Sequence, residues 1–363
     1  MVKRYSLLFI SGCLPLLSAA QIQHSAVVVE SQTDSIFRQY DLDEIVVTGT
    51  RTPKFLKDTP IQTRVITSAD IAKIDATNVQ DLLQQELPGV EFSFSMNQQT
   101  HLNFSGFGGQ SILFLVDGER LAGETMDDVD FTRLMMDNVE RIEIVKGAAS
   151  ALYGSSASGG VINIITKKAS KPWTLNLNGR LAKHGEQRYG GTFGLNSKHW
   201  SNMLSANYNT TDNYSVNSGP NPVTRVISTI YGDKTINTRE QLTWKPSTAL
   251  SFTGRAGYFF RETTRTIGQP ERYRDFSGGL RMNWTMSAFD QLRVNYSFDQ
   301  YDKSNYQTVR RLDIRSYSNV QNTVRALYSH EFERGDVLTL GSDYMHDYLY
   351  NTNLDGSTRE QDC

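Results

Sequence analysis

The chain has 363 residues, a formal net charge of −2, 38% hydrophobic residues and 21% charged residues. Beyond the first 20 residues it has no run of 18 or more apolar residues, which excludes a helical membrane protein. The 38 aromatic residues (17 Phe, 17 Tyr and 4 Trp) exclude a disordered chain. The near-neutral charge gives no basic field for nucleic acid, and 2 cysteines cannot build a disulfide scaffold.

Aromatic residues are distributed unevenly along the chain. Residues 1–170 contain 12 of them and no Trp, whereas residues 171–363 contain 26, including all 4 Trp. The two parts are therefore expected to sit in different solvents or to perform different tasks.

The N-terminus has the pattern of an export signal. Lys3 and Arg4 precede a mostly apolar stretch, Tyr5–Leu17, and small residues follow it, so residues 1–20 are predicted to be a cleaved signal peptide. The alternative is a lipoprotein signal ending before Cys13, but that would leave an apolar run of only about eight residues.

A polar tether and an α+β domain follow. Residues 21–43 have few structure signals and are expected to be flexible. Residues 44–168 alternate strand and helix patterns, and Asp117-Gly118 predicts a primed hairpin turn. The expected strands are Ile61–Ile66, Val90–Phe94, Ile112–Val116, Val139–Val145 and Val161–Thr166. The expected helices run from a cap at Ser68 through Ile74, and from a cap at Thr77 over Asn78–Glu86.

Residues 169–363 have the period of a membrane β-barrel. Apolar and polar residues alternate, as in the Trp173, Leu175 and Leu177 face against the Asn176 and Asn178 face. We count roughly nine such strands, each near the ~10 residues of a tilted membrane strand. A face rich in Arg, Asn, Ser and Thr fits a polar lumen better than the exposed face of a sandwich.

Connection lengths alternate between short and long, as in outer-membrane barrels. The short turns are expected at Asn196–His199, Lys245–Ala249, Thr285–Phe289 and Glu333–Gly335. The long polar loops are expected at Ala182–Tyr189, Asn209–Asn237, Arg261–Asp275 and Tyr301–Ser318. A soluble meander needs no such alternation.

Several ordered motifs in residues 44–168 resemble those of TonB-dependent receptors. The motifs are Glu44–Arg51 at the opening, Val116–Gly118 and Val139–Gly147 in the plug core, and Ser150–Gly154 with Gly159–Lys167 at the junction with the barrel. One departure is Ser105 before Gly106, where the family usually has Arg, which puts any ion pair made there in doubt.

The resemblance implies an α+β plug domain followed by an antiparallel transmembrane β-barrel of about 22 strands, of which this chain supplies about nine. It also implies that TonB contacts the segment formed by Glu44, Ile45, Val46, Val47 and Thr48. This β-prone segment follows a polar tether, so it can add as a strand to an exposed sheet edge. The alternative is that Ile45–Val47 is simply the first strand of the plug, and both can hold at different stages.

Ligand and cofactor signals are weak. None of the six histidines sits at metal-pair spacing. His101 and His184 are the ligand candidates, because an imidazole can ligate haem iron, and an ordinary exposed histidine is the alternative for each. No catalytic constellation or nucleotide loop stands out, so neither an enzyme nor a cofactor is predicted. An acidic cluster lacks the EF-hand spacing of a calcium site, so it is expected to be a solvated loop. It consists of Glu124, Asp127, Asp128 and Asp130.

The resemblance implies a receptor in the outer membrane of a Gram-negative bacterium, in contact with its lipid. TonB would energise uptake of a scarce nutrient. The tether leaves only about 23 residues before Glu44, too short for the extra N-terminal domain of glycan importers, which favours siderophore-iron, haem or cobalamin over an oligosaccharide. The alternative is a truncated, non-transporting fragment that acts as a binding or signalling module. No nucleic-acid partner is expected.

The strand count bears on barrel closure. The 195 residues after Lys168 suffice for about nine or ten strands at roughly 20 residues each. An eight-stranded barrel has room only for its own side chains, so a plug would not fit inside it. The last strand, near Val337–Tyr344, is expected to run outward with Asp347–Cys363 in an external loop, leaving an unpaired sheet edge.

Overall fold

The structure is a computed structural model of the chain. The residues that it describes are 45–49, 54–56, 61–74, 76, 78–94, 100–123, 130–134, 136–147, 153–154, 157–217, 226–266, 269–354, 356 and 360–362. They belong to the unit Leu42–Cys363. The predicted signal peptide and the predicted tether, residues 1–20 and 21–43, lie outside the described residues.

The N-terminal domain is built on a five-stranded sheet. Its strands are β3 (Thr63–Thr67), β7 (Ile112–Val116), β8 (Glu119–Arg120), β9 (Val139–Lys146) and β10 (Gly160–Thr166). The order in space is β3-β9-β10-β7-β8, with β10 parallel to β7 and the other neighbours antiparallel. The strands predicted for this sheet are confirmed, with ends that shift by at most two residues.

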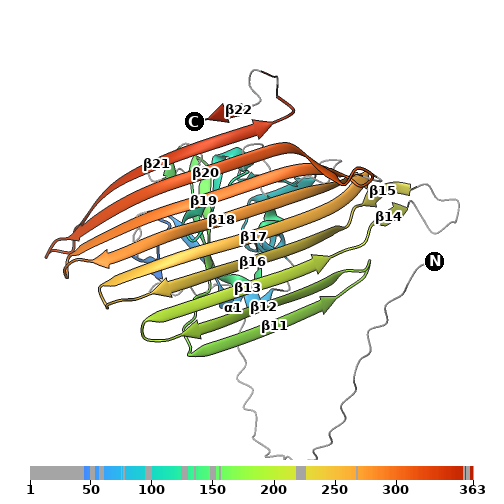
Figure 1. Ribbon diagram of the computed structural model, residues 1–363. Coiled ribbons are helices and arrows are strands. Elements are labelled where there is room, and N and C mark those ends of the chain that lie inside the picture. The colour runs from blue at the N-terminus through green and yellow to red at the C-terminus, as the bar shows by residue number, and fades with distance from the viewer. Residues whose placement is uncertain are drawn as a thin grey trace, which may run out of the picture. The chain divides into compact units, whose positions relative to one another are not determined.

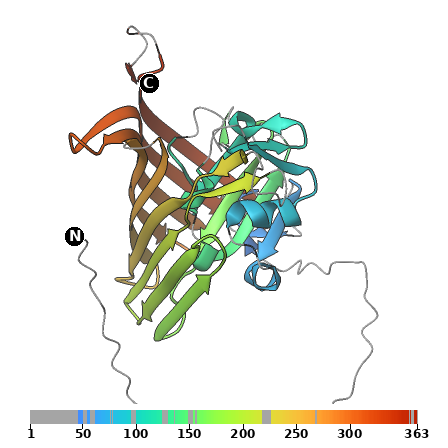
Figure 2. The same cartoon turned by 90° about the vertical axis from the view of Figure 1, so that its right-hand side faces the viewer.

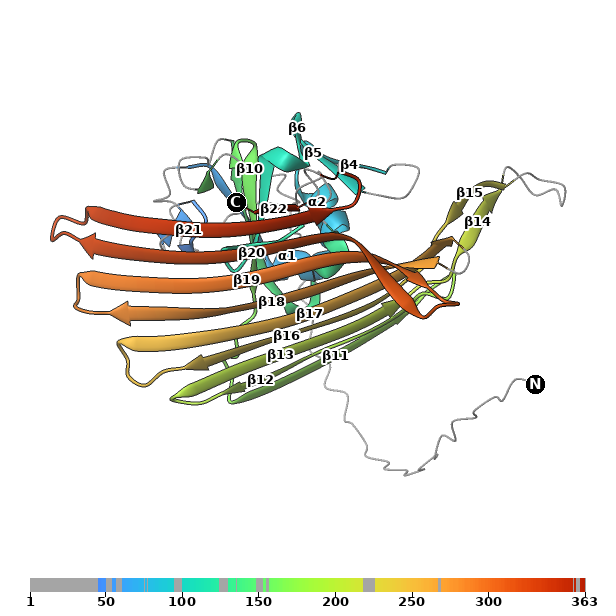
Figure 3. The same ribbon diagram turned by 45° about the horizontal axis from the view of Figure 1, so that its top comes forward.

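Smaller elements complete the domain (Figure 3). A two-stranded sheet contains β1 (Ile45–Val46) and β2 (Lys54–Phe55), and a three-stranded sheet contains β4 (Val90–Phe94), β5 (Thr100–Phe104) and β6 (Phe107–Gly108). The helices are α1 (Ser68–Lys73) and α2 (Val79–Glu86), and the 3₁₀ turns are η2 (Gly109–Ser111), η3 (Phe131–Arg133) and η4 (Met136–Asn138). None of the described helices is long and apolar enough to cross a bilayer.

Both helix caps differ from the prediction by one residue. Thr67 caps α1 in place of Ser68, because β3 runs directly into the helix and Thr67 keeps an extended backbone; its hydroxyl accepts from Asp70 N at 3.2 Å. The Asp70 carboxylate accepts in return from Thr67 N, which completes a capping box. Asn78 caps α2 in place of Thr77, since its side-chain oxygen accepts the third amide of the helix at 2.8 Å.

The core lies between the five-stranded sheet and the elements packed on one of its faces. Leu82 and Leu83 of α2 are fully buried, as are Phe114, Ile142 and Ile162 of the sheet, and all belong to one apolar cluster. A smaller apolar cluster covers the other face and consists of Leu113, Leu115, Val145, Ala157 and Val161. Both faces of the central strands are therefore covered, as the continuous apolar run in β7 requires.

The C-terminal part forms one large antiparallel sheet of 10 strands (Figure 1). Its strands, in spatial order, are β11 (Trp173–Leu181), β12 (Gln187–Asn196), β13 (Trp200–Thr210), β16 (Asp233–Trp244), β17 (Leu250–Thr266), β18 (Gln269–Thr285), β19 (Asp290–Gln307), β20 (Leu312–Glu331), β21 (Val337–Asn351) and β22 (Glu360–Asp362). Nine of them are long and β22 has 3 residues, so the predicted count is confirmed. The sheet curves, with the N-terminal domain on its concave side (Figure 2).

The short turns lie where the sequence predicts them. They occupy residues 197–199, 245–249, 286–289 and 332–336, and they define what we call the short-turn end of the large sheet. The opposite end carries a separate hairpin of β14 (Tyr214–Asn217) and β15 (Val226–Ile230), within the loop predicted between Asn209 and Asn237.

Three of the predicted long loops are wrong, because strand pairing continues through them. β17 reaches Thr266 before β18 begins at Gln269, and only residues 308–311 separate β19 from β20. The first loop is also short, at residues 182–186. Beyond the part of each strand that has an apolar outward face, the strands carry polar residues on both faces. The alternation of apolar and polar residues therefore stops there, while backbone pairing between the strands continues. Cross-strand ion pairs support the extensions, such as Arg272 with Glu262 at 2.6 Å.

The outward face of the large sheet is apolar and exposed. Leu177 and Leu280 are 76% and 66% exposed. All 4 Trp lie close to the short-turn end of their strands, and each is at least 41% exposed; they are Trp173, Trp200, Trp244 and Trp284. Trp200 and Trp244 stack at 5.7 Å between ring centroids. A row of Trp at one level is the girdle expected where a barrel meets a membrane–water interface.

The large sheet does not close within the described residues. β11 and β22 are its end strands and do not pair with each other. The segment predicted as an external loop, Asp347–Cys363, instead begins with the end of β21, which reaches Asn351, and contains β22.

We therefore expect this chain alone to lack the heat-resistant fold of a closed barrel, because two unpaired edges expose backbone amides and carbonyls. Samples refolded in detergent should migrate alike on a gel with and without heating. A band that shifts on heating, or stable single-channel conductance from this chain alone, would contradict an open sheet.

Candidate functional site

The segment Ile45–Thr48 is docked on the N-terminal domain and is called the docked segment below. Its first two residues form β1, which pairs antiparallel with β2. Val46 and Thr48 are fully buried. In this state the segment is the first strand of the domain, which was the alternative reading of its sequence. Glu44 lies outside the described residues.

A buried carboxylate holds the docked segment. Glu143 of β9 is fully buried, and its Oε2 accepts from Val47 N at 2.9 Å, from Thr48 N at 2.8 Å and from the Thr48 hydroxyl at 2.5 Å. Its Oε1 accepts from Arg141 Nε and Nη2 at 2.9 and 2.8 Å. A buried charge is tolerated only when such partners replace water. Each hydrogen bond to a charged group contributes roughly 1.5–3 kcal/mol, so this carboxylate is the main anchor of the segment.

Asn163 connects the docked segment to a turn. Its side chain, 1% exposed on β10, donates from Nδ2 to the Thr48 hydroxyl at 2.9 Å. Its Oδ1 accepts from Gly118 N at 3.0 Å. The Tyr153 hydroxyl adds a hydrogen bond to Thr48 O at 3.0 Å. One amide side chain therefore touches both the docked segment and the β7–β8 turn.

The β7–β8 turn is the predicted primed turn, with φ of 54° at Asp117 and 84° at Gly118. The Asp117 carboxylate accepts from Thr166 N and Oγ1 at 2.9 and 2.8 Å. Burial would raise the pKa of Asp117, but the charge of Arg255 and the hydrogen bonds from Thr166 outweigh it and hold the pKa below its usual value. The turn therefore keeps its negative charge at neutral pH.

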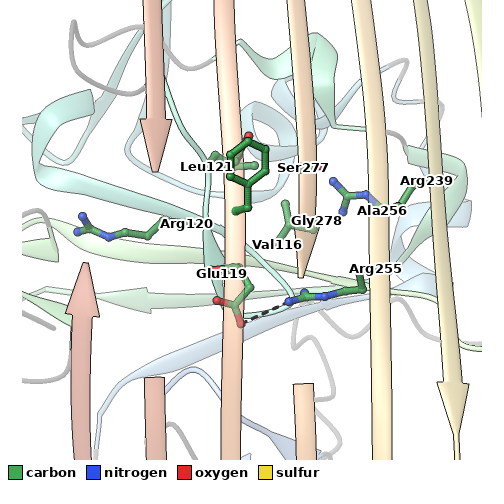
Figure 4. A pocket seen from close by; sticks show the side chains of 12 residues that line it. Val116, Glu119, Arg120, Leu121, Arg239, Arg255, Ala256, Ser277 and Gly278 are labelled. Atoms are coloured by element: carbon green, nitrogen blue, oxygen red, sulfur yellow. Dashed lines mark ion pairs between the residues drawn. The ribbon is translucent and has the colours of Figure 1, made fainter. Parts of the chain in front are cut away.

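Arginines of the large sheet face this turn. Arg281 Nη2 donates to Asp117 O at 2.7 Å and to Glu119 Oε1 at 2.9 Å. Arg255 Nη2 lies 3.5 Å from the same Glu119 oxygen, and Figure 4 shows the two side chains pointing toward each other. Arg325 Nη1 donates to Gly118 O at 3.3 Å. Arginines of three strands of the large sheet, β17, β18 and β20, thus contact one turn of the N-terminal domain.

A second contact buries a charge cluster. Arg133 is 6% exposed and donates from Nη2 to Asp275 and to Asp299, the latter at 3.1 Å. Its Nη1 donates to Ala122 O at 2.6 Å, while Ala122 N donates to Asp299 Oδ2 at 2.9 Å. The guanidinium also lies 4.8 Å from the Tyr301 ring centroid. One cation of the N-terminal domain therefore pairs with two buried carboxylates of the large sheet.

Several cavities lie between the N-terminal domain and the large sheet. One of about 50 Å³ lies beside Glu119 and Arg255 (Figure 4) and has room only for water. One of about 390 Å³ is lined by the β7–β8 turn, by Val47 and by Trp284, and so lies toward the short-turn end. One of about 240 Å³ lies between η4 and β11–β16.

Comparisons with known proteins agree with this architecture. The family model of the TonB-dependent Receptor Plug Domain matches residues 56–161. The vitamin B12 transporter BtuB of Photobacterium profundum is 35% identical over 125 residues, which are 34% of this chain and 20% of that protein. The BtuB of Vibrio cholerae is 38% identical over 131 residues, which are 36% of this chain and 21% of that protein. The chain thus spans about a fifth of these curated relatives.

Solved structures share the fold over most of the chain. A ferric enterobactin receptor, PfeA of Pseudomonas aeruginosa, superposes with a TM-score of 0.67 at 19% identity and covers 85% of this chain and 51% of its own. The siderophore receptor PiuA of Acinetobacter baumannii gives 0.65 at 15% identity, with coverages of 82% and 46%.

This chain carries the plug domain of a TonB-dependent receptor. The N-terminal domain is that plug, and the large sheet has the fold of the wall of the receptor barrel, incomplete in this chain. The matched residues 56–161 fall inside the range 44–168 predicted for the plug, whose boundaries stay a prediction.

The two histidines predicted as ligand candidates lie on separate elements. His101 is half-buried in β5 of the plug. His184 is exposed in the turn between β11 and β12, and its ring stacks on Tyr214 at 3.7 Å. Both assignments stay predictions. Within the described residues no group of three or more His, Cys, Asp or Glu side chains could hold a metal. Of the predicted acidic cluster only Asp130 is described, and it pairs with Arg261 at 3.1 Å.

The sequence reasoning missed the residues that join the receptor's parts. Glu143, Asn163 and Arg133 were not singled out, although each is at most 6% exposed. One signal was available for Glu143, because the alternation of β9 places it on one face with Arg141 and the buried Val145. A carboxylate beside a buried valine has to find partners inside the protein. Arg133 carried no such signal, since its carboxylate partners lie more than 140 residues away.

Replacing Glu143 with Gln should loosen the docked segment, because neutral acceptors make weaker hydrogen bonds than a carboxylate. We expect the Val47 and Thr48 amides to exchange with deuterium about tenfold faster or more, which corresponds to about 1.4 kcal/mol. Glu140→Gln is the matched control, since Glu140 is 43% exposed and touches Arg141 but not the segment. Equal exchange in the wild type and Glu143→Gln would show that the carboxylate is not the anchor.

Replacing Arg133 with Leu should separate the plug from the wall, because Asp275 and Asp299 would stay buried without their ion-pair partner. We expect a loss of about 3–5 kcal/mol in unfolding free energy, measured by urea titration in detergent. Adding Asp275→Asn and Asp299→Asn should restore much of it. Arg188→Leu, which removes a half-exposed pair with Glu186, should cost less than about 1 kcal/mol. A small loss in Arg133→Leu, or no rescue, would contradict the assignment.

Proposed function

We propose that this chain is the plug and part of the barrel wall of an outer-membrane receptor that takes up a scarce nutrient with energy delivered by TonB. The docked segment is the part that TonB engages. The observation that carries this proposal is the position of the segment, because Val47 lines the 390 Å³ cavity together with Trp284, Thr285 and Leu292 of the short-turn end.

The position fits the direction of energy transfer. Short turns of outer-membrane barrels face the periplasm, and TonB reaches its receptors from that side. A segment held at the short-turn end, preceded by the predicted tether, is available to a periplasmic partner. The long polar strand extensions and the β14–β15 hairpin then lie on the outer side, where a nutrient arrives.

The anchoring suggests how the segment changes partner. Its backbone ladder in the plug is only two residues long, and side chains supply the remaining bonds through Glu143, Asn163 and Tyr153. A strand of TonB can offer backbone hydrogen bonds in their place, as in other cases of strand addition. The docked state would then be the resting state, and the TonB-bound state would transmit a pull on the plug through a paired backbone.

The outward face supports a membrane location. Exposed leucines cover the wall, and the Trp row marks one interface with lipid headgroups. The wall's inner face is polar and contacts the plug. This arrangement matches a barrel whose lumen is blocked by a plug domain.

The nutrient class follows from the relatives rather than from a single side chain. Relatives similar in the plug are vitamin B12 transporters, and neighbours similar in fold are receptors for ferric enterobactin and other siderophores. We infer that the nutrient is cobalamin, an iron siderophore or haem, with His101 and His184 as the first residues to test for a haem contact. Members of this family are receptors and transporters rather than enzymes.

Proline at position 47 should uncouple binding from uptake. Proline removes the Val47 amide and fixes φ, so the segment cannot pair as a strand with TonB. In cells that express the receptor containing this chain, Val47→Pro should bind its nutrient at the surface and import none.

Two controls separate TonB engagement from docking. Val47→Ala keeps the amide and should import normally. Glu143→Gln weakens docking without removing the amide and should still import. Import by Val47→Pro at the normal rate would contradict the proposed role of the segment, and loss of surface binding would show that the change acts on the fold instead.

A further inference from the structure

The 390 Å³ cavity has an unusual charge balance. Its lining includes Arg281, Arg293 and Arg325 of the wall, together with Arg141 and Lys168 of the plug side. The carboxylates that line it are Asp117 and Glu119 of the β7–β8 turn, so cations exceed anions by five to two. Arg141 pairs with Glu143, and Arg325 Nε pairs with Asp343 at 2.9 Å, so two of the five cations have a further carboxylate partner. The other three cations are Lys168, Arg281 and Arg293.

Three of the lining residues form a continuous row across the wall. Arg281 of β18 lies directly opposite Asn295 of β19, and Asn295 lies directly opposite Arg325 of β20. Directly opposed residues in an antiparallel sheet are close neighbours on the same face. The row therefore places two guanidinium groups on either side of one amide side chain, all facing the cavity.

Polar atoms in this row have no partner within the described part of the chain. Asn295 is 2% exposed, yet neither its Nδ2 nor its Oδ1 forms a hydrogen bond, and Arg281 Nε also lacks one. Buried polar groups are normally satisfied, so two unused donors (Arg281 Nε and Asn295 Nδ2) and one unused acceptor (Asn295 Oδ1) at a cavity wall indicate a ligand or solvent contact.

The plug already places an anion at this row. Glu119 Oε1 accepts from Arg281 Nη2 at 2.9 Å, and the backbone carbonyls of Asp117 and Gly118 accept from Arg281 and Arg325 at 2.7 and 3.3 Å. The carboxylate of Glu119 thus shows how an oxyanion is received here. It uses only part of the donor set, because Arg281 Nε and Asn295 Nδ2 stay unused.

We propose that Arg281, Asn295 and Arg325 form a binding site for an oxyanion, a phosphate or carboxylate group, in the short-turn half of the lumen. Guanidinium groups match the planar, paired oxygens of these groups, and the Asn295 amide donates to a third oxygen. Glu119 competes for the same donors from within the chain. The role of this oxyanion site in the transit of an anionic nutrient rests on the proposed function, whereas oxyanion binding by the site does not.

The site also adjoins the docked segment, since Val47 and Tyr153 line the same cavity. Departure of the docked segment would remove part of the cavity wall on the side that faces the periplasm under the proposed function. An anion held at the row would then have an exit. The docked segment and the oxyanion site are therefore neighbours, but uptake tests the first and phosphate binding tests the second.

The test is equilibrium dialysis of the full chain in detergent against radiolabelled inorganic phosphate at constant ionic strength, with chloride as the balancing anion. We expect saturable binding of one phosphate per chain. Arg281→Gln with Arg325→Gln should weaken it by about tenfold or more, because two charged donors are lost. Glu119→Gln should tighten binding several-fold, because it removes the internal competitor. Arg188→Gln, at the opposite end of the wall, is the matched control and should bind as the wild type does.

Two further variants guard against misfolding. Asn295→Asp keeps the size of the side chain but adds a negative charge to the row, and it should abolish binding. Arg281→Lys keeps the charge and should retain much of the affinity. The proposal is overturned by no saturable binding to the wild type, by equal binding in the double Gln variant, or by weaker binding in Glu119→Gln. Those outcomes would leave the proposed TonB contact standing, because that contact is tested by uptake in Val47→Pro and not by phosphate binding.

Discussion

The rest of this structure depends on one constraint, the burial of the Glu143 carboxylate away from solvent. Glu143 is fully buried in the central strands of the plug, so its oxygens must be satisfied by protein donors. The nearest backbone donors are those of Val47 and Thr48, 96 and 95 residues earlier in the chain. Docking of the N-terminal segment therefore supplies hydrogen-bond donors to the buried Glu143 carboxylate. Release of the segment removes these donors and leaves Arg141 as its partner. The segment and the plug are coupled by this requirement.

The same buried polar groups lead from the docked segment to the barrel wall. Thr48 bonds to Asn163, Asn163 bonds to Gly118, and Gly118 bonds to Arg325 of β20. The Arg133 cluster fastens the plug to the wall at a second place. Under the proposed function, a pull on the segment would act on the β7–β8 turn through these hydrogen bonds, and the turn is the part that covers the arginine row.

The sequence could predict what repeats locally. The period of two identified the wall strands and their outward face, and local patterns located five plug strands to within two residues, although β5 and β6 were not predicted. It failed where tertiary pairing overrides composition. Polar strands beyond the apolar zone looked like loops, and the caps of α1 and α2 moved by one residue because Thr67 and Asn78 have the extended backbone that a cap requires. The site was the hardest part, since Glu143, Arg133 and Arg281 acquire their roles from partners that are distant in sequence.

The most direct test of this account is the affinity of the purified periplasmic domain of TonB for the chain in detergent. Docking reduces the fraction of molecules whose segment is free, so weakening the anchor should raise the apparent affinity. Glu143→Gln should bind TonB more tightly, by the same factor as it accelerates amide exchange of Val47 and Thr48, while Glu140→Gln should match the wild type. Unchanged or weaker binding of Glu143→Gln would contradict the claim that this buried carboxylate holds the segment that TonB engages.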